Sequence, residues 1–175
     1  MLAAGAMSAV SAAALVSGLA AAPAQAAPGD LTCRGTATVD FKPGVTFNAA
    51  ATSISGTAQL GVNADPATAC TSTTGKTMTG GTFVLDPVTT TASCAATKAR
   101  GTGRILWNNG NSPSRVTWAV DFSVFPPQRS FMVMVASGPL AGDTATFDVT
   151  PSSQTGDCST GLTQLVANNI TATFR

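Results

Sequence analysis

Residues 115–124 read RVTWAVDFSV, and this stretch decides the expected fold. Its apolar residues fall at every second position from Val116 through Trp118 to Val124, with mostly polar residues between them. A period of two is typical of an antiparallel strand that turns one face to the core and the other to water. The stretch therefore predicts a half-buried β-strand.

The same alternation recurs along the chain, in segments around 35–41, 54–62, 83–85, 145–149 and 170–174. Glycine and proline pairs such as Gly80-Gly81 and Pro126-Pro127 separate these segments and mark turns. The run from Phe131 to Val135 is apolar without alternation, which predicts a central strand covered on both faces. Together these patterns predict an all-β fold, an antiparallel β-sandwich of the Greek-key or Ig-like kind with roughly seven to nine strands.

One hairpin is placed by the dipeptide Asn109-Gly110, which favours a two-residue type I′ turn. In the resulting register Lys98 faces Asp121, Arg104 faces Arg115, and Gly101 faces Trp118, so that the glycine leaves room for the indole ring. Pro113 cannot donate a backbone hydrogen bond on the returning strand, which leaves a longer loop as the alternative.

Residues 1–26 contain no charged side chain, are rich in alanine, and end in the small-residue pattern of Ala24 and Ala26. This composition predicts a signal peptide that is cleaved before Ala27, with a transmembrane anchor as the alternative. The remaining 27–175 would form a single domain. We expect the mature protein to be secreted or extracellular, either free or held noncovalently at the cell surface, with no stable membrane span after cleavage.

The four cysteines, an even number in an exported domain, predict two disulfides. Of the three connectivities we favour Cys33–Cys70 with Cys94–Cys158. A metal site is the weaker alternative, because no two cysteines are close in sequence and the chain has no histidine.

The chain lacks histidine, glutamate and tyrosine, and only 10% of its residues are charged. Without histidine there is no Ser-His-Asp or Cys-His catalysis, and no cofactor motif is present. We therefore expect a protein that is not an enzyme; a hydrolase using two aspartates is the least favoured alternative. The net charge of +1 argues against nucleic acid as a partner.

Two groups of residues are candidates for binding. If Trp107 is exposed, it could stack on a sugar ring while Asn108, Asn109 and Asn111 bond hydroxyls; the alternative is that Trp107 belongs to the core. The second group is a basic strip that would attract an anionic polymer, unless its side chains simply diverge into solvent. The strip consists of Lys98, Arg100, Arg104 and Arg115.

These features predict a non-catalytic binding or structural module that contacts cell-wall or extracellular polysaccharide. The alternative is a secreted protein-interaction or inhibitor domain. Its partner would bind exposed loops such as Thr71–Thr79 or the segment 126–129.

The motif that begins Cys33-x-Gly35-Thr36-Ala37-Thr38, together with the segment from Gly101 to Ser114, resembles a group of small secreted β-sandwich proteins of high-GC Gram-positive bacteria. The resemblance implies an exported β-sandwich with paired cysteines, and it carries over no functional residue. The chain departs from the pattern at Leu106, where threonine is usual, and at Pro113.

Overall fold

The structure is a computed structural model that describes residues 31–109, 112–123 and 128–175. These residues form strands and connecting loops and contain no helix. The predicted signal peptide and Asn111 lie outside the described residues, as do Gly110 of the Asn109-Gly110 turn and residues 126 and 127 of the segment 126–129. The strands are β1 (Leu31–Val45), β2 (Ala50–Gly61), β3 (Gly80–Ala92), β4 (Thr97–Trp107), β5 (Ser114–Ser123), β6 (Gln128–Ser137), β7 (Thr144–Val149), β8 (Ser153–Thr155) and β9 (Leu162–Phe174).

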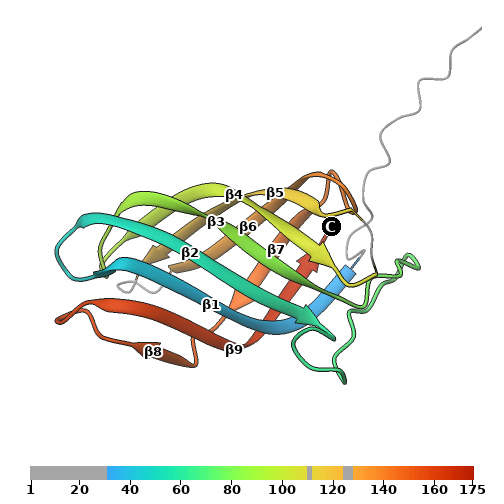
Figure 1. The fold of residues 1–175 in the computed structure, drawn as a ribbon, viewed down its shortest axis with the longest axis horizontal. Coiled ribbons are helices and arrows are strands. Elements are labelled where there is room, and N and C mark those ends of the chain that lie inside the picture. The colour runs from blue at the N-terminus through green and yellow to red at the C-terminus, as the bar shows by residue number, and fades with distance from the viewer. Residues whose placement is uncertain (1–30, 110–111, 124–127) are drawn as a thin grey trace, which may run out of the picture.

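The strands close into an eight-stranded antiparallel barrel, so the predicted β-sandwich is wrong (Figure 1). Each strand from β1 to β6 pairs with the next one along the chain, and β9 pairs with both β7 and β1. The β1–β9 ladder runs from Leu31 opposite Phe174 to Val45 opposite Leu162. The all-β and antiparallel parts of the prediction are confirmed. An inner face that alternates with an outer face has the same period in a barrel as in a sandwich.

One edge of β9 is shared by two strands. β7 pairs with β9 from Val149 opposite Ile170 to Ala145 opposite Phe174, and the three-residue β8 pairs with β9 further back, around Leu165. The ladder between β6 and β7 is also short, ending where Phe131 faces Phe147. The barrel wall is therefore less tightly joined near the beginning of β6 and the end of β7.

The register of the β4–β5 hairpin is confirmed pair by pair. Lys98 faces Asp121 and forms an ion pair with it at 2.9 Å, and Gly101 faces Trp118. A Cβ atom on Gly101 would lie 2.6 Å from Cζ2 of Trp118, so the indole ring occupies the space that glycine leaves. The ring is held there by a 2.7 Å hydrogen bond from its Nε1 to the carbonyl oxygen of Thr102.

Both expected disulfides are present, and they lie at opposite ends of the barrel. Cys33–Cys70 ties the β2–β3 loop to the beginning of β1. Cys94–Cys158 joins the β3–β4 connection to the loop before β9. Each end of the barrel is thus fastened by one covalent link across its loops.

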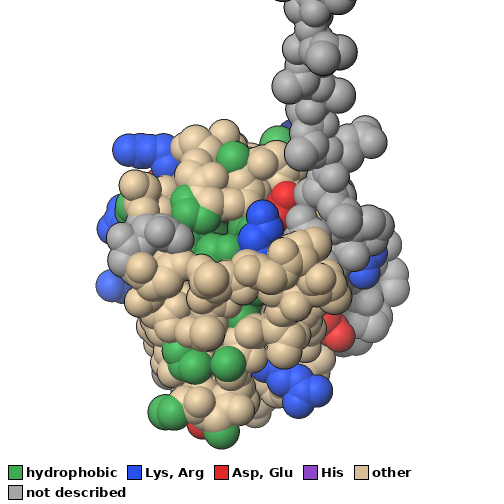
Figure 2. All heavy atoms as spheres, turned by 90° about the vertical axis from the view of Figure 1, so that its right-hand side faces the viewer, with side chains coloured by type: hydrophobic (Ala, Val, Ile, Leu, Met, Phe, Trp, Pro, Cys, Tyr) green, Lys and Arg blue, Asp and Glu red, His purple; other side chains and the backbone are tan. Residues whose placement is uncertain are grey.

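The end of the barrel where β1 begins is filled by side chains. Leu31, Trp107 and Phe174 are at most 5% exposed, and the rings of Trp107 and Phe174 meet edge to face at 5.7 Å. Seen from this end, the surface is mostly uncharged polar groups and backbone, with scattered lysines and arginines (Figure 2).

The run from Phe131 to Val135 is not covered on both faces as predicted. Val133 and Val135 point into the barrel and are buried, but Met132 and Met134 are 54% and 56% exposed. A barrel made of one sheet has no second layer to cover its outer face, so the two methionines meet solvent.

We expect Gly101→Ala to destabilise the protein by about 1–3 kcal/mol, the usual penalty for forcing extra atoms into a packed core. The Trp118 ring would have to move, which should weaken the near-ultraviolet circular dichroism of the tryptophans. Chemical denaturation measures the stability change, and Arg100→Ala on the outer face of the same strand is the control. Full retention of both stability and the tryptophan signal would contradict this packing.

Candidate functional site

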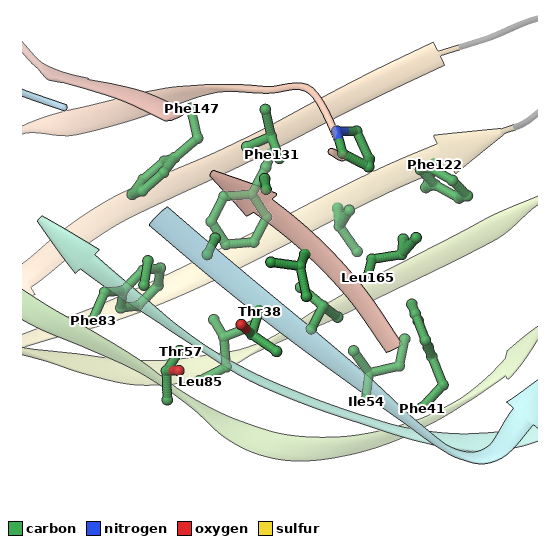
Figure 3. A pocket seen from close by; sticks show the side chains of 18 of the residues that line it. Thr38, Phe41, Ile54, Thr57, Phe83, Leu85, Phe122, Phe131, Phe147 and Leu165 are labelled. Carbon is green, nitrogen blue, oxygen red and sulfur yellow. The ribbon is translucent and has the colours of Figure 1, made fainter. Parts of the chain in front are cut away.

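An apolar cavity of about 140 Å³ lies inside the barrel, in the half away from the Trp107 end. Figure 3 shows its labelled aromatic and aliphatic side chains pointing toward a common space from strands on different sides of the barrel. The inward-facing side chains that line it include Phe41, Ile54, Leu85, Val120, Phe131, Phe147 and Leu165. An eight-stranded barrel has an interior just wide enough either to be filled by side chains or to hold one small ligand.

Small residues on one wall create this space. Ala37 on β1 faces Ala58 on β2 and Ala167 on β9, so three alanines form a row across three neighbouring strands. Gly56 lies two residues before Ala58 on the same inner face of β2, opposite Val39. At this level β1, β2 and β9 contribute only small side chains, and the larger Phe41, Ile54 and Leu165 of the same strands line the cavity further along.

Three phenylalanines close one end of the cavity. Phe83 on β3 and Phe147 on β7 reach toward each other from opposite strands of the barrel, with their ring centroids 5.7 Å apart. Phe131 packs on both, at 5.1 Å from Phe147 and 6.0 Å from Phe83, and also stacks on Trp118 at 6.1 Å. The three phenylalanines hold one another in place, so the cavity has a rigid aromatic end next to the row of small residues.

The cavity is only partly sealed. Most inward-facing residues near the Trp107 end are fully buried, whereas Val39, Val120, Val149 and Leu165 around the cavity keep partial exposure. Partly exposed apolar side chains inside a barrel are what an apolar ligand would cover.

The cavity lining offers few polar groups. The hydroxyl of inward-facing Thr97 donates to the carbonyl oxygen of Ser93 at 2.9 Å, so it is already engaged. Thr38 and Thr57 face each other at positions that alternate with the inward alanines, and Asp121 pairs with Lys98 on the outer face. The site therefore has the chemistry of a hydrocarbon pocket.

The indole ring of Trp107 is not available for stacking on a sugar. The residue is 5% exposed, and its Nε1 donates to Oγ of Ser114 at 2.9 Å, so the core alternative holds for this residue. Asn108 is exposed but engaged: it donates to Thr79 Oγ1 at 2.8 Å and accepts from the Gly80 amide at 3.2 Å. Asn109 contacts Thr77 in the same loop, so these two asparagines join the β4–β5 and β2–β3 loops.

The basic strip lies on the outer face of the β4–β5 hairpin, as expected, and part of it is neutralised within the chain. Arg104 faces Arg115, and a carboxylate oxygen of Asp86 lies 3.8 Å from the Arg104 guanidinium. Both side chains of that ion pair are about half exposed, so the pair contributes little to stability. None of the four residues of the strip lines the cavity. The link between the two is Asp121, which lines the cavity and forms the ion pair with Lys98.

The segment Thr71–Thr79 forms a loop, as expected, apart from a bridge between Thr71 and Thr32. Its residue Met78 is buried beneath the loop at 4% exposure. The loop is thus anchored near both of its ends.

The loop that carries Cys158 has its own fixed turn. Asp157 Oδ1 accepts hydrogen bonds from the amides and hydroxyls of Ser159 and Thr160 at 2.6–3.0 Å. These bonds favour the charged carboxylate and lower the pKa of Asp157 from 3.8 to about 2. Ionised Asp157 therefore holds the loop next to the second disulfide, at the cavity end of the barrel.

No model of a known family, no curated protein and no solved structure matches this chain. Within the described ranges, no three histidine, cysteine or acidic side chains gather where a metal ion could be held. The described part of the chain also contains no helix with the length and apolarity needed to cross a lipid bilayer. The function has to be argued from the geometry of the barrel.

The cavity was not among the sites expected from the sequence. In the alternating sequence pattern, the residues that line the cavity appear only as core positions. An inward alanine gives the same pattern whether or not a neighbouring side chain fills the space beside it. The available signal was the grouping of small inward residues on three strands, of which β1 and β2 are consecutive and β9 joins them only when the barrel closes.

We expect acid to remove the contribution of Asp157 to stability. Since its pKa is lowered on folding, that contribution is complete above pH 3.8 and is lost as the pH falls through about 2. Melting temperatures measured from pH 5 to pH 2 should fall less steeply in Asp157→Asn than in wild type, with Asp148→Asn as the control. Equal slopes for Asp157→Asn and wild type would show that the turn does not depend on the charge.

Proposed function

We propose that the protein is a non-catalytic binding protein that holds a small apolar ligand, or the apolar part of a larger one, inside the barrel. The observation that carries the proposal is the 140 Å³ cavity with its apolar lining. An engineered apolar cavity of about 150 Å³ in another protein stays dry and binds benzene or xenon. A cavity of this size and chemistry is therefore sufficient for binding.

The pattern of side-chain exposure favours a ligand site inside the barrel over one on its outer surface. Apolar side chains that remain partly exposed, such as Val120, Phe131 and Leu165, gather around one partly open cavity. A ligand there would remove apolar surface from water, which is the main driving force for binding such molecules.

The earlier expectation of polysaccharide binding has less support. It relied on an exposed Trp107 flanked by free asparagines, whereas the ring is buried and Asn108 bonds the β2–β3 loop. Binding of an anionic polymer by Arg115 and its neighbours remains a second candidate, because these side chains are exposed on one face.

The two disulfides are compatible with an extracellular protein. We propose that the chain is secreted, with residues 1–26 acting as a signal peptide. A soluble carrier of apolar molecules would act outside the cell, where such molecules dissolve poorly in water.

Filling the cavity should abolish binding. In Ala37→Leu the new carbons would occupy the empty space beside Ala58 and Ala167. The free energy of unfolding of the unliganded protein should therefore rise, by about 1–2 kcal/mol. Benzene and 1-hexanol should raise the melting temperature of the wild type but not of Ala37→Leu.

Ala51→Leu is the matched control, since it adds the same carbons at an exposed position of β2. It should respond to both compounds as the wild type does. A wild-type protein whose melting temperature is unchanged by either compound would count against the proposed function. So would an equal response in Ala37→Leu.

A further inference from the structure

The shape of the cavity limits what can fill it. It is lined by three successive inward residues of β1, Ala37, Val39 and Phe41. Strands advance about 3.3 Å per residue, so these residues span roughly 13 Å of strand. At the usual tilt of barrel strands this is roughly 10 Å along the barrel axis. Figure 3 shows the same extension, with Phe83 and Phe147 at one end and Phe41 and Phe122 at the other.

A volume of 140 Å³ spread over this length makes a narrow channel. The three phenylalanines close one end of this channel, because Phe83 and Phe147 approach each other across the barrel at 5.7 Å. Toward the other end the channel is lined by Val39, Val120 and Leu165, which are partly exposed. A rounded molecule of that volume would have to move side chains on both sides of the channel, whereas an extended chain lies along it.

The wall chemistry excludes a polar group from the deep part of the channel. That part is formed by Ala37, Ala58, Ala167 and the phenylalanine cluster, whose side chains have no hydrogen-bonding atoms. A buried hydroxyl or amide without a partner costs free energy. The polar groups nearest the channel, Thr97 and Asp121, lie toward its other end and are engaged with Ser93 and Lys98.

From these observations we infer that the ligand is an amphiphile with a single hydrocarbon chain. Resting on the proposed function, this inference places the chain lengthwise in the channel, with its end toward the phenylalanines, and leaves the polar head outside the barrel. Since a benzene-sized cavity holds about six carbon atoms, the channel takes up a chain of about that length. The head contributes little to affinity, because among the described residues the charged side chain that lines the channel, Asp121, is paired with Lys98.

The test is a chain-length series on the wild-type protein. Dissociation constants for the 1-alkanols from 1-butanol to 1-decanol would be measured by titration calorimetry or nuclear magnetic resonance. Each added methylene should tighten binding by a factor of about 4 until the channel is full, at about six carbons, and longer chains should gain much less.

Compact molecules separate this inference from the proposed function. If benzene and cyclohexane bind more tightly than 1-hexanol, the chain inference is overturned while the proposed function stands. If neither the rings nor the alkanols bind, both are overturned. A constant gain per methylene up to 1-decanol, with no break, would also overturn the inference, because the chain would not be confined by the channel.

The head group gives an independent readout. Hexanoate, 1-hexanol and hexylammonium should bind within a factor of about 5 of one another, since a charge outside the barrel makes only solvent-screened contacts. A larger preference for one head group would place that group in a specific polar site and overturn the orientation.

Discussion

The pairing of β1 with β9 is the constraint on which the rest of the molecule depends. It joins the first and last long strands of the described chain, from Leu31 opposite Phe174 to Val45 opposite Leu162. Closure removes both free edges of the main sheet, which would otherwise invite pairing with other chains. It also fixes one face of every strand as the inside, so all the inward residues share a single interior.

Within that interior the two halves of the barrel differ in how side chains fill them. Near the beginning of β1, Trp107 and Phe174 pack against each other beneath Leu31 and leave the interior closed. In the other half the alanine row adds no bulk, and the interior stays hollow beyond Phe83 and Phe147, which meet across the barrel. The barrel thus has a filled end that provides stability and a hollow end whose walls are held by Cys94–Cys158 and the surrounding loops.

Local features of the sequence predicted local structure well. The strand from Arg115, the Lys98–Asp121 pair and the space for Trp118 beside Gly101 all follow from period-two alternation and one turn. Closure could not be predicted in the same way, because sandwich and barrel strands alternate alike and only the distant pairing of β1 with β9 distinguishes them. The cavity depends on that closure, since it brings Ala167 of β9 beside Ala37, which the β1–β2 hairpin already pairs with Ala58.

The hollow half has a stability cost that favours a role for it. Cavities left by shortened core side chains cost about 24 cal/mol per Å³, so 140 Å³ corresponds to about 3 kcal/mol. This is a large part of the 5–15 kcal/mol that separates a typical folded domain from its unfolded state. A longer side chain in place of Ala37 would reduce this cost without disturbing the β1–β9 ladder, because the side chain faces empty space. A barrel that served only as a stable framework would gain from such a change, whereas one that binds an apolar ligand recovers the cost when the ligand is bound.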